Sequence, residues 1–145
     1  ASARVQRVIT LGTPHLGTLA PVQALRGTYP TVRRLAALDR LHSAEALTES
    51  IFRDYPSLYG MLPGPAHTGG MNLFDAGSWP GSGPRPNVTL LREALAMQRT
   101  LPGGDERYQC IAGIGQRTAT ALCLVADDFE YEVSSDGDGT VPATG

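Results

Sequence analysis

The sequence contains no lysine, so all 12 of its basic residues are arginine, and 14 acidic residues bring the net charge to −2. So small a net charge argues against a nucleic-acid partner and against electrostatic binding to an acidic membrane surface. The chain also has no apolar run near the ~20 residues that a membrane-spanning helix needs. The composition therefore predicts neither a nucleic-acid-binding protein nor a transmembrane segment.

Cysteine is scarce, with only Cys110 and Cys123, each in an apolar run. A disulfide between them and two buried thiols are equally compatible with the sequence, and two cysteines do not define a redox compartment. The three histidines, His15, His42 and His67, are scattered, and no CxxC or HxxxH spacing is present. We therefore expect neither a metal site nor a cofactor.

Glycine and proline are abundant, at 17 and 11 of 145 residues, while 41% of the residues are hydrophobic. The length fits one domain, and the composition favours a folded chain with long loops over a disordered one. Arginine dominates before residue 41 and acidic residues dominate over 105–138. We interpret these two charge runs as solvated faces.

Two short apolar segments, 4–11 and 108–114, predict buried strands. The first ends in Gly12-Thr13-Pro14-His15-Leu16-Gly17, which can continue neither a strand nor a helix. A buried strand that ends in a glycine-bracketed loop is typical of a parallel α/β sheet with functional loops at its carboxyl edge. Segments 119–126 and 129–133 predict two further strands, the second half-exposed.

Helices are expected between the two buried strands. They are predicted over 21–27, over 31–41, from an N-cap at Ser43 to about Asp54, and from an N-cap at Asn87 to Pro102. Residues 55–87 are rich in proline and glycine but also hold large apolar and aromatic side chains, so we expect an ordered loop. The predicted fold class is α/β.

The segment SSDGDGTVPATG, residues 134–145, places two carboxylates in a glycine frame after a strand. Asp138 suits the acid that orients a histidine base in a serine hydrolase, and its glycine neighbours allow a close approach to another loop. Asp136 is a competing candidate. A solvated turn is the simpler interpretation, and a calcium loop fits poorly because the distant glutamate ligand is absent.

Four segments together resemble one enzyme family: VITLGTPHLGT (8–18), YPSLYGMLP (55–63) with a later Trp79, CIAGIGQRT (110–118) and GDGTVP (137–142). They are similar, in this order, to the lecithin:cholesterol acyltransferase family and related lipases of the α/β-hydrolase fold. The resemblance implies a serine acyl hydrolase or O-acyltransferase acting on lipid-like esters. Hydrolysis and acyl transfer share the acyl-enzyme, so the sequence leaves both open.

The resemblance also implies roles for particular residues. Asp138 matches the catalytic acid, and Asp136 becomes a turn former. His15 is expected to be a structural histidine rather than the base, in a loop near the active site that Thr13 and Gly17 shape.

The resemblance divides the chain into a core strand and loop (1–17), a helical cap insertion (18–105) and a second core strand with hairpin and acid loop (106–145). A cap supplies an apolar acyl pocket and limits water access. The expected candidates for contact with the acyl chain come from the cap, although ordinary core packing is the safer expectation for any one of them. They are Tyr55, Tyr59, Met61, Leu62 and Trp79.

The sequence departs from the family pattern in two ways. It contains no G-x-S-x-G motif, and the serines that follow a glycine, Ser78 and Ser82, lie in predicted loops rather than between a strand and a helix. In addition, no histidine follows Asp138. We therefore expect an internal portion of a larger enzyme, with the serine, the histidine, further strands and any targeting signal outside these residues. The alternative is a hydrolase-like binding module without a triad; compartment and oligomeric state stay open.

An incomplete sheet has a structural consequence. Buried parallel strands without their neighbours leave apolar faces in contact with water. We expect exposed apolar side chains on and beside the two core strands. They are Val5, Val8, Ile9, Ile111 and Ile114.

Overall fold

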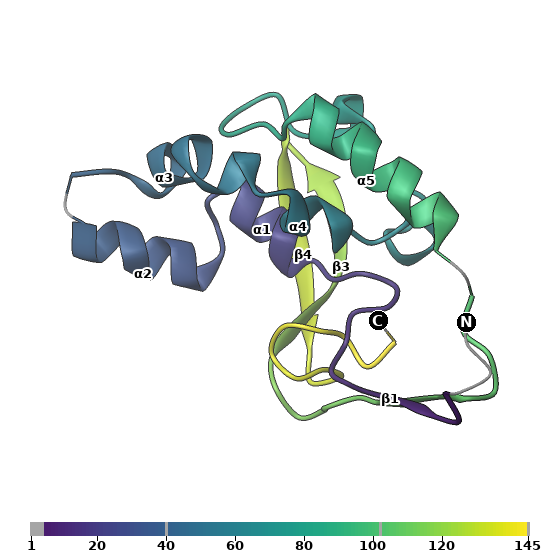
Figure 1. Ribbon diagram of the computed structural model, residues 1–145. Helices are drawn as coiled ribbons and strands as arrows, with labels where there is room; N and C mark the ends of the chain where they lie inside the picture. Colours follow the sequence, from purple (N-terminus) through teal and green to yellow (C-terminus); the bar gives the residue numbers. More distant parts are fainter. Residues whose placement is uncertain (1–4, 40, 102, 145) are drawn as a thin grey trace.

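The computed structural model describes residues 5–39, 41–101 and 103–144, a mixed α/β arrangement of one parallel strand pair, one antiparallel hairpin and several helices (Figure 1). Strand β1 (Val8–Leu11) pairs in parallel with β2 (Tyr108–Ile111), with Val8 opposite Tyr108. All of the helices in the described residues lie between these strands in sequence. The predicted α/β class is confirmed, whereas a complete α/β-hydrolase sheet is not.

Two helix starts follow directly from side-chain caps. The hydroxyl of Ser43 accepts a hydrogen bond from the Ala46 backbone N–H at 3.1 Å, and Asn87 Oδ1 accepts from Thr89 N–H at 3.0 Å. Both N-caps were predicted, because Ser and Asn satisfy backbone donors that the first helical turn leaves free. The helices are α1 (Ala20–Leu25), α2 (Pro30–Asp39), α3 (Ala44–Ser50), α4 (Pro56–Gly60) and α5 (Val88–Thr100).

The helix from Ser43 ends earlier than predicted. Helix α3 stops at Ser50, and a separate 3-10 turn, η1 (Phe52–Asp54), follows before α4. Two further 3-10 turns, η2 (Pro65–His67) and η3 (Ala76–Ser78), lie in the segment that was expected to be an ordered loop. No described helix is both long enough and apolar enough to cross a membrane.

The last two strands form a long hairpin, β3 (Thr118–Val125) and β4 (Asp128–Ser134). Its two-residue tip places Ala126 and Asp127 at positive φ, 48° and 64°, which matches the right-handed twist of the strands. The Asp127 carboxylate accepts hydrogen bonds from the backbone N–H groups of Gly81 at 2.8 Å and Ser82 at 3.1 Å. The tip is therefore held to the loop between η3 and α5.

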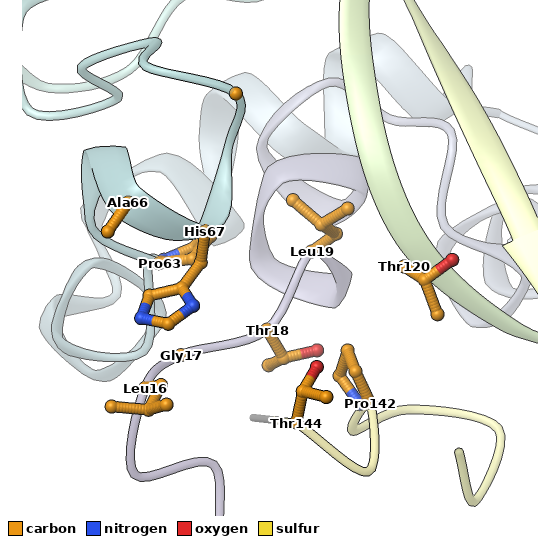
Figure 2. A pocket seen from close by; sticks show the side chains of 11 residues that line it. Leu16, Gly17, Thr18, Leu19, Pro63, Ala66, His67, Thr120, Pro142 and Thr144 are labelled. Carbon is orange, nitrogen blue, oxygen red and sulfur yellow. The ribbon is translucent and has the colours of Figure 1, made fainter. Parts of the chain in front are cut away.

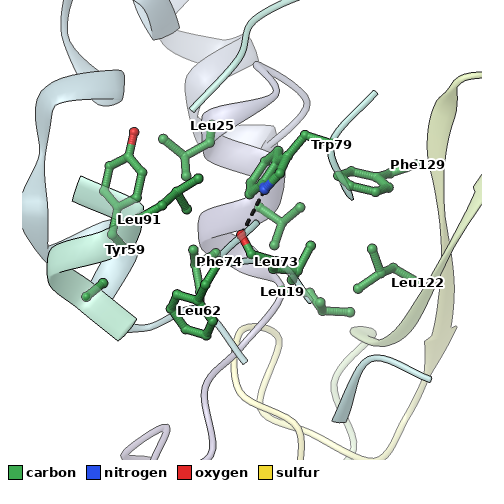
Figure 3. Packing of buried hydrophobic residues seen from close by; sticks show 12 residues of the cluster. Leu19, Leu25, Tyr59, Leu62, Leu73, Phe74, Trp79, Leu91, Leu122 and Phe129 are labelled. Carbon is green, nitrogen blue, oxygen red and sulfur yellow. Dashed lines mark hydrogen bonds between the residues drawn. The ribbon is translucent and has the colours of Figure 1, made fainter. Parts of the chain in front are cut away.

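The hydrophobic core lies between the helical region and this hairpin (Figure 3). Trp79 is buried, stacks edge-on against Phe129 of β4 at 5.6 Å between ring centroids, and donates its Nε1–H to the Leu73 carbonyl at 2.8 Å. Leu122 of β3 joins the same cluster. The hairpin thus buries Leu122 and Phe129 against the helical region, where removing apolar area from water stabilises the fold. Its other large aliphatic side chains, Leu124, Val125 and Val133, are exposed.

The parallel pair is much less covered than the core. Leu11 is 71% exposed and Ile114 72% exposed, and Val5, Ile9 and Ile111 are also exposed, while Val8 is half-buried. The expectation of exposed apolar side chains around these strands is confirmed. The expectation of two buried strands is wrong: the residues of β1 alternate between half-buried and exposed, and the four residues of β2 are all exposed. Strand β2 also ends at Ile111 rather than at residue 114.

The cysteines also differ from the expected alternatives. Cys110 on β2 and Cys123 on β3 are both free thiols and both exposed. They are neither buried nor joined to each other, because one lies on the open parallel pair and the other on the outer face of the hairpin.

Candidate functional site

The segment after β4, residues 135–144, is named here the acid loop, and it returns to the carboxyl ends of β1 and β2 (Figure 1). Gln116 and Asp138 form an isolated parallel bridge, in which the Gln116 N–H donates to the Gly137 carbonyl at 3.0 Å. A Cβ on Gly113 would lie 2.9 Å from Cβ of Asp138. Asp138 therefore packs directly against the loop that leaves β2.

The two carboxylate oxygens of Asp138 have different surroundings. Oδ1 accepts hydrogen bonds from the backbone N–H groups of Val141 at 2.8 Å and Thr140 at 2.9 Å, whereas Oδ2 accepts none from the described residues. The hydrogen bonds from Val141 and Thr140 lower the pKa of Asp138 below its ordinary value. Asp138 is thus an exposed, ionised carboxylate with one oxygen fixed and the other free to accept a hydrogen bond.

Oδ2 faces the loop that follows β1. A Cβ on Gly12 would lie 3.1 Å from this oxygen, and Gly12 has a positive φ of 55°. Thr13 and Gly12 line, together with Asp138 and Val141, a small cavity of about 40 Å³. The fold thus brings Asp138 next to the loop of residues 12–17, although the two are more than 120 residues apart in sequence. They meet at the carboxyl edge of the parallel strand pair.

The loop from Thr13 to Gly17 holds the other predicted loop residues. His15 is exposed, and its Nε2 lies 2.9 Å from the Thr10 hydroxyl. Gly17 is buried at φ 90°, and a Cβ there would lie 2.5 Å from Cα of Pro63. His15 thus hydrogen-bonds back to strand β1, and Gly17 permits close contact between this loop and the helical region.

An apolar pocket of about 460 Å³ extends from the acid loop into the helical region. Gly12 and Val141 line both this pocket and the small cavity beside Asp138, so the two spaces adjoin. Most of the remaining lining is aliphatic or aromatic. It includes Tyr29, Val32, Leu35, Phe52, Leu58 and Met61.

The structure separates the five residues that were expected to contact an acyl chain. Met61 lines the apolar pocket, but Tyr59, Leu62 and Trp79 are buried in the hydrophobic core and Tyr55 is exposed outside the pocket lining. Ordinary core packing explains the three buried residues. Val32 and Leu35 of α2 also line the pocket. The sequence predicted them only as apolar positions of a helix and did not indicate a binding role.

A second, more polar pocket of about 280 Å³ is lined by the Leu16–Leu19 segment (Figure 2). The His67 imidazole points into it, as do side chains of Thr120 on β3 and Thr144 at the end of the acid loop.

Across the described ranges, no group of three or more His, Cys, Asp or Glu side chains gathers where a metal ion would bind.

Comparison with known proteins adds no assignment. No family model matches the chain, and searches of curated proteins and of solved structures returned no match either.

Proposed function

We propose that this chain carries the acid of a Ser-His-Asp triad and the acyl pocket of a serine acyl hydrolase or O-acyltransferase that acts on lipid-like esters. The observation that supports this most is the asymmetry of Asp138. Oδ1 is held by the N–H groups of Val141 and Thr140, and Oδ2 is free at the carboxyl edge of a parallel strand pair.

A triad acid needs this asymmetry. It accepts a hydrogen bond from Nδ1–H of the histidine, which fixes the tautomer and stabilises the imidazolium that forms when the histidine takes the serine proton. A carboxylate with one oxygen fixed by backbone donors presents the other in a defined direction. Asp138 is ionised at neutral pH even at the ordinary aspartate pKa of 3.8, and the hydrogen bonds from Val141 and Thr140 lower its pKa further. In this proposal the serine and the histidine come from outside these residues.

The apolar pocket supports the substrate class. It begins at Gly12 and Val141, beside the carboxylate, and is lined further in by Val32, Leu35 and Phe52. A pocket of about 460 Å³ with aliphatic and aromatic walls suits the acyl chain of an ester, because burying apolar surface drives such binding. The ester carbonyl would then lie near the carboxyl edge of β1 and β2.

The test is carried out on the full-length protein that contains these residues, with p-nitrophenyl esters of increasing acyl length. Asp138→Asn is expected to lower kcat by about 10⁴-fold, because the histidine loses its orienting acid. Asp136→Asn is the matched control, since Asp136 is an exposed neighbour in the same loop and should retain wild-type kcat.

A fluorophosphonate probe identifies the nucleophile in the same protein. We expect the labelled serine outside these 145 residues, and slower labelling in Asp138→Asn. Labelling of Ser78 or Ser82, or equal activity of the two aspartate variants, would contradict the proposal. Retained fatty-acid binding without labelling or turnover would instead establish the alternative, a hydrolase-like binding module without a triad.

A further inference from the structure

The side chain of Thr118 lies directly beneath the segment that carries Asp138. Thr118 is the first residue of β3 and is only 1% exposed. Its hydroxyl donates a hydrogen bond to the Gln116 carbonyl at 2.9 Å and accepts one from the Gly139 backbone N–H at 2.8 Å. One buried hydroxyl therefore connects the strand β3 to the residue that immediately follows the acid.

The residue that precedes the acid is packed against the same side chain. A Cβ on Gly137 would lie 2.4 Å from the Thr118 hydroxyl oxygen and 2.7 Å from both Cβ and Cγ2 of Thr118. Gly137 therefore has to be glycine because Thr118 occupies the space that a side chain would fill. The two glycines of Gly137-Asp138-Gly139 have separate contacts with Thr118, one by packing and one by a hydrogen bond.

A second threonine holds the loop further along. The Thr18 hydroxyl, at the entrance to α1, donates to the carbonyl of Thr140, whose N–H donates to Oδ1 of Asp138. Thr18 touches the loop only beyond the acid, whereas Thr118 contacts both residues beside it. Thr118 thus fixes the backbone on both sides of Asp138, together with the Gln116 N–H that donates to the Gly137 carbonyl and the Asp138 N–H that donates to the Val141 carbonyl.

We propose that Thr118 is a positioning residue for Asp138: its methyl group and hydroxyl set the backbone of Gly137 and Gly139 so that Oδ2 keeps its direction. The inference rests on the proposed function of Asp138 as a triad acid. Small displacements of a catalytic group lower kcat steeply, by roughly 10²-fold for 1 Å. Thr118 touches no part of the apolar pocket lining, so substrate binding should be preserved when it is changed.

The experiment compares three variants of the full-length protein. Thr118→Val keeps the shape but removes both hydrogen bonds, and is expected to lower kcat by about 10- to 100-fold with KM unchanged. Thr118→Ser keeps the hydroxyl and should restore most of kcat. Thr89→Val, on α5, is the matched control, because the Thr89 side chain is exposed and its hydroxyl makes no hydrogen bond among the described residues, and it should leave kcat unchanged.

Two further measurements separate positioning from general stability. In an Asp138→Asn background, Thr118→Val should lower kcat by less than twofold, because residues that act as a unit are non-additive. If Thr118→Val does not fold, judged by circular dichroism and thermal unfolding, Thr118→Ser is compared with Thr118→Cys. These two are close in size, and the weaker hydrogen bonding of the thiol should lower kcat for Cys only.

The outcomes distinguish this inference from the proposed function. If Asp138→Asn retains wild-type kcat, the triad assignment fails and the role of Thr118 fails with it. If Asp138→Asn is inactive while folded Thr118→Val keeps wild-type kcat, only the positioning role is overturned. A loss of kcat in Thr118→Val that is fully additive with Asp138→Asn would also overturn it.

Discussion

Oδ2 of Asp138 lies against the backbone of Gly12, so closely that a Cβ at residue 12 would come within 3.1 Å of the oxygen. This contact joins the first and last loops of the described chain at the carboxyl edge of the β1–β2 pair. A methyl group at residue 12 would occupy the space beside Oδ2, the oxygen that accepts no hydrogen bond from the described residues. The contact therefore makes Gly12 a sensitive position for the function proposed for Asp138.

Under the function proposed for Asp138, Gly12→Ala is expected to abolish most of the ester hydrolysis by the full-length protein. The alanine would be strained at a φ of 55°, at a cost of about 1–3 kcal/mol, and its Cβ would press on Oδ2. Gly69→Ala is the control, because Gly69 has a similar positive φ of 63° but no neighbouring atom within 4 Å of a Cβ. Both variants should lose similar stability in thermal unfolding, and only Gly12→Ala should lose kcat; equal kcat would contradict the expectation.

The acyl specificity should depend on α2. Leu35 is 45% exposed and lines the apolar pocket, whereas Leu38 on the same helix is 79% exposed and does not line it. Leu35→Trp should lower kcat/KM for long-chain esters by about 10-fold or more relative to short-chain esters, because the indole fills part of the pocket. Leu38→Trp should leave the chain-length profile unchanged, and an equal shift in both variants would refute the pocket assignment.

The hairpin tip should contribute stability that depends on pH. The hydrogen bond from the Gly81 N–H, followed by that from Ser82, lowers the pKa of Asp127 below its ordinary value of about 3.8. Because the folded-state pKa is the lower one, the stabilisation is fully present above the ordinary pKa. It is lost as the pH falls through the folded-state value.

Asp127→Asn tests this contribution without changing the backbone, since asparagine tolerates positive φ. The variant should unfold a few degrees below the wild type at about pH 7, and this difference should shrink as the solution is acidified through the pKa of Asp127. Glu130→Gln, an exposed neighbour on β4, is the control and should not change the midpoint. A pH-independent difference would show that the charge of Asp127 is not the cause.

Local features of the fold were predictable from the sequence, because their causes lie within a few residues. Ser43 and Asn87 cap helices through hydrogen bonds to N–H groups two or three positions ahead. The glycines around Asp138 likewise indicated a close approach before its partner was known. The hairpin of β3 and β4 followed from alternating apolar residues separated by a short turn.

Features that depend on distant residues were not predictable. Trp79, Tyr59, Phe52 and Leu35 are all large side chains with mainly apolar surface. Trp79 and Tyr59 nevertheless fill the core, whereas Phe52 and Leu35 line the pocket. Periodicity shows that a side chain leaves water, but not which neighbour covers it. The contact of Thr118 with Gly137 was likewise hidden, because only the folded β3 brings residue 118 beneath the acid loop.

The hydrogen bond from Thr18 to the Thr140 carbonyl joins residues that are 122 positions apart. Bringing together residues so far apart lowers the conformational entropy of the whole intervening chain. A helix such as α5 forms from neighbouring residues and does not have this entropic cost. We therefore expect the carboxylate of Asp138 to take its final direction late in folding, after the helical region and hairpin have docked. A partly folded chain would then contain most of the secondary structure while the Asp138 carboxylate still lacked a fixed direction.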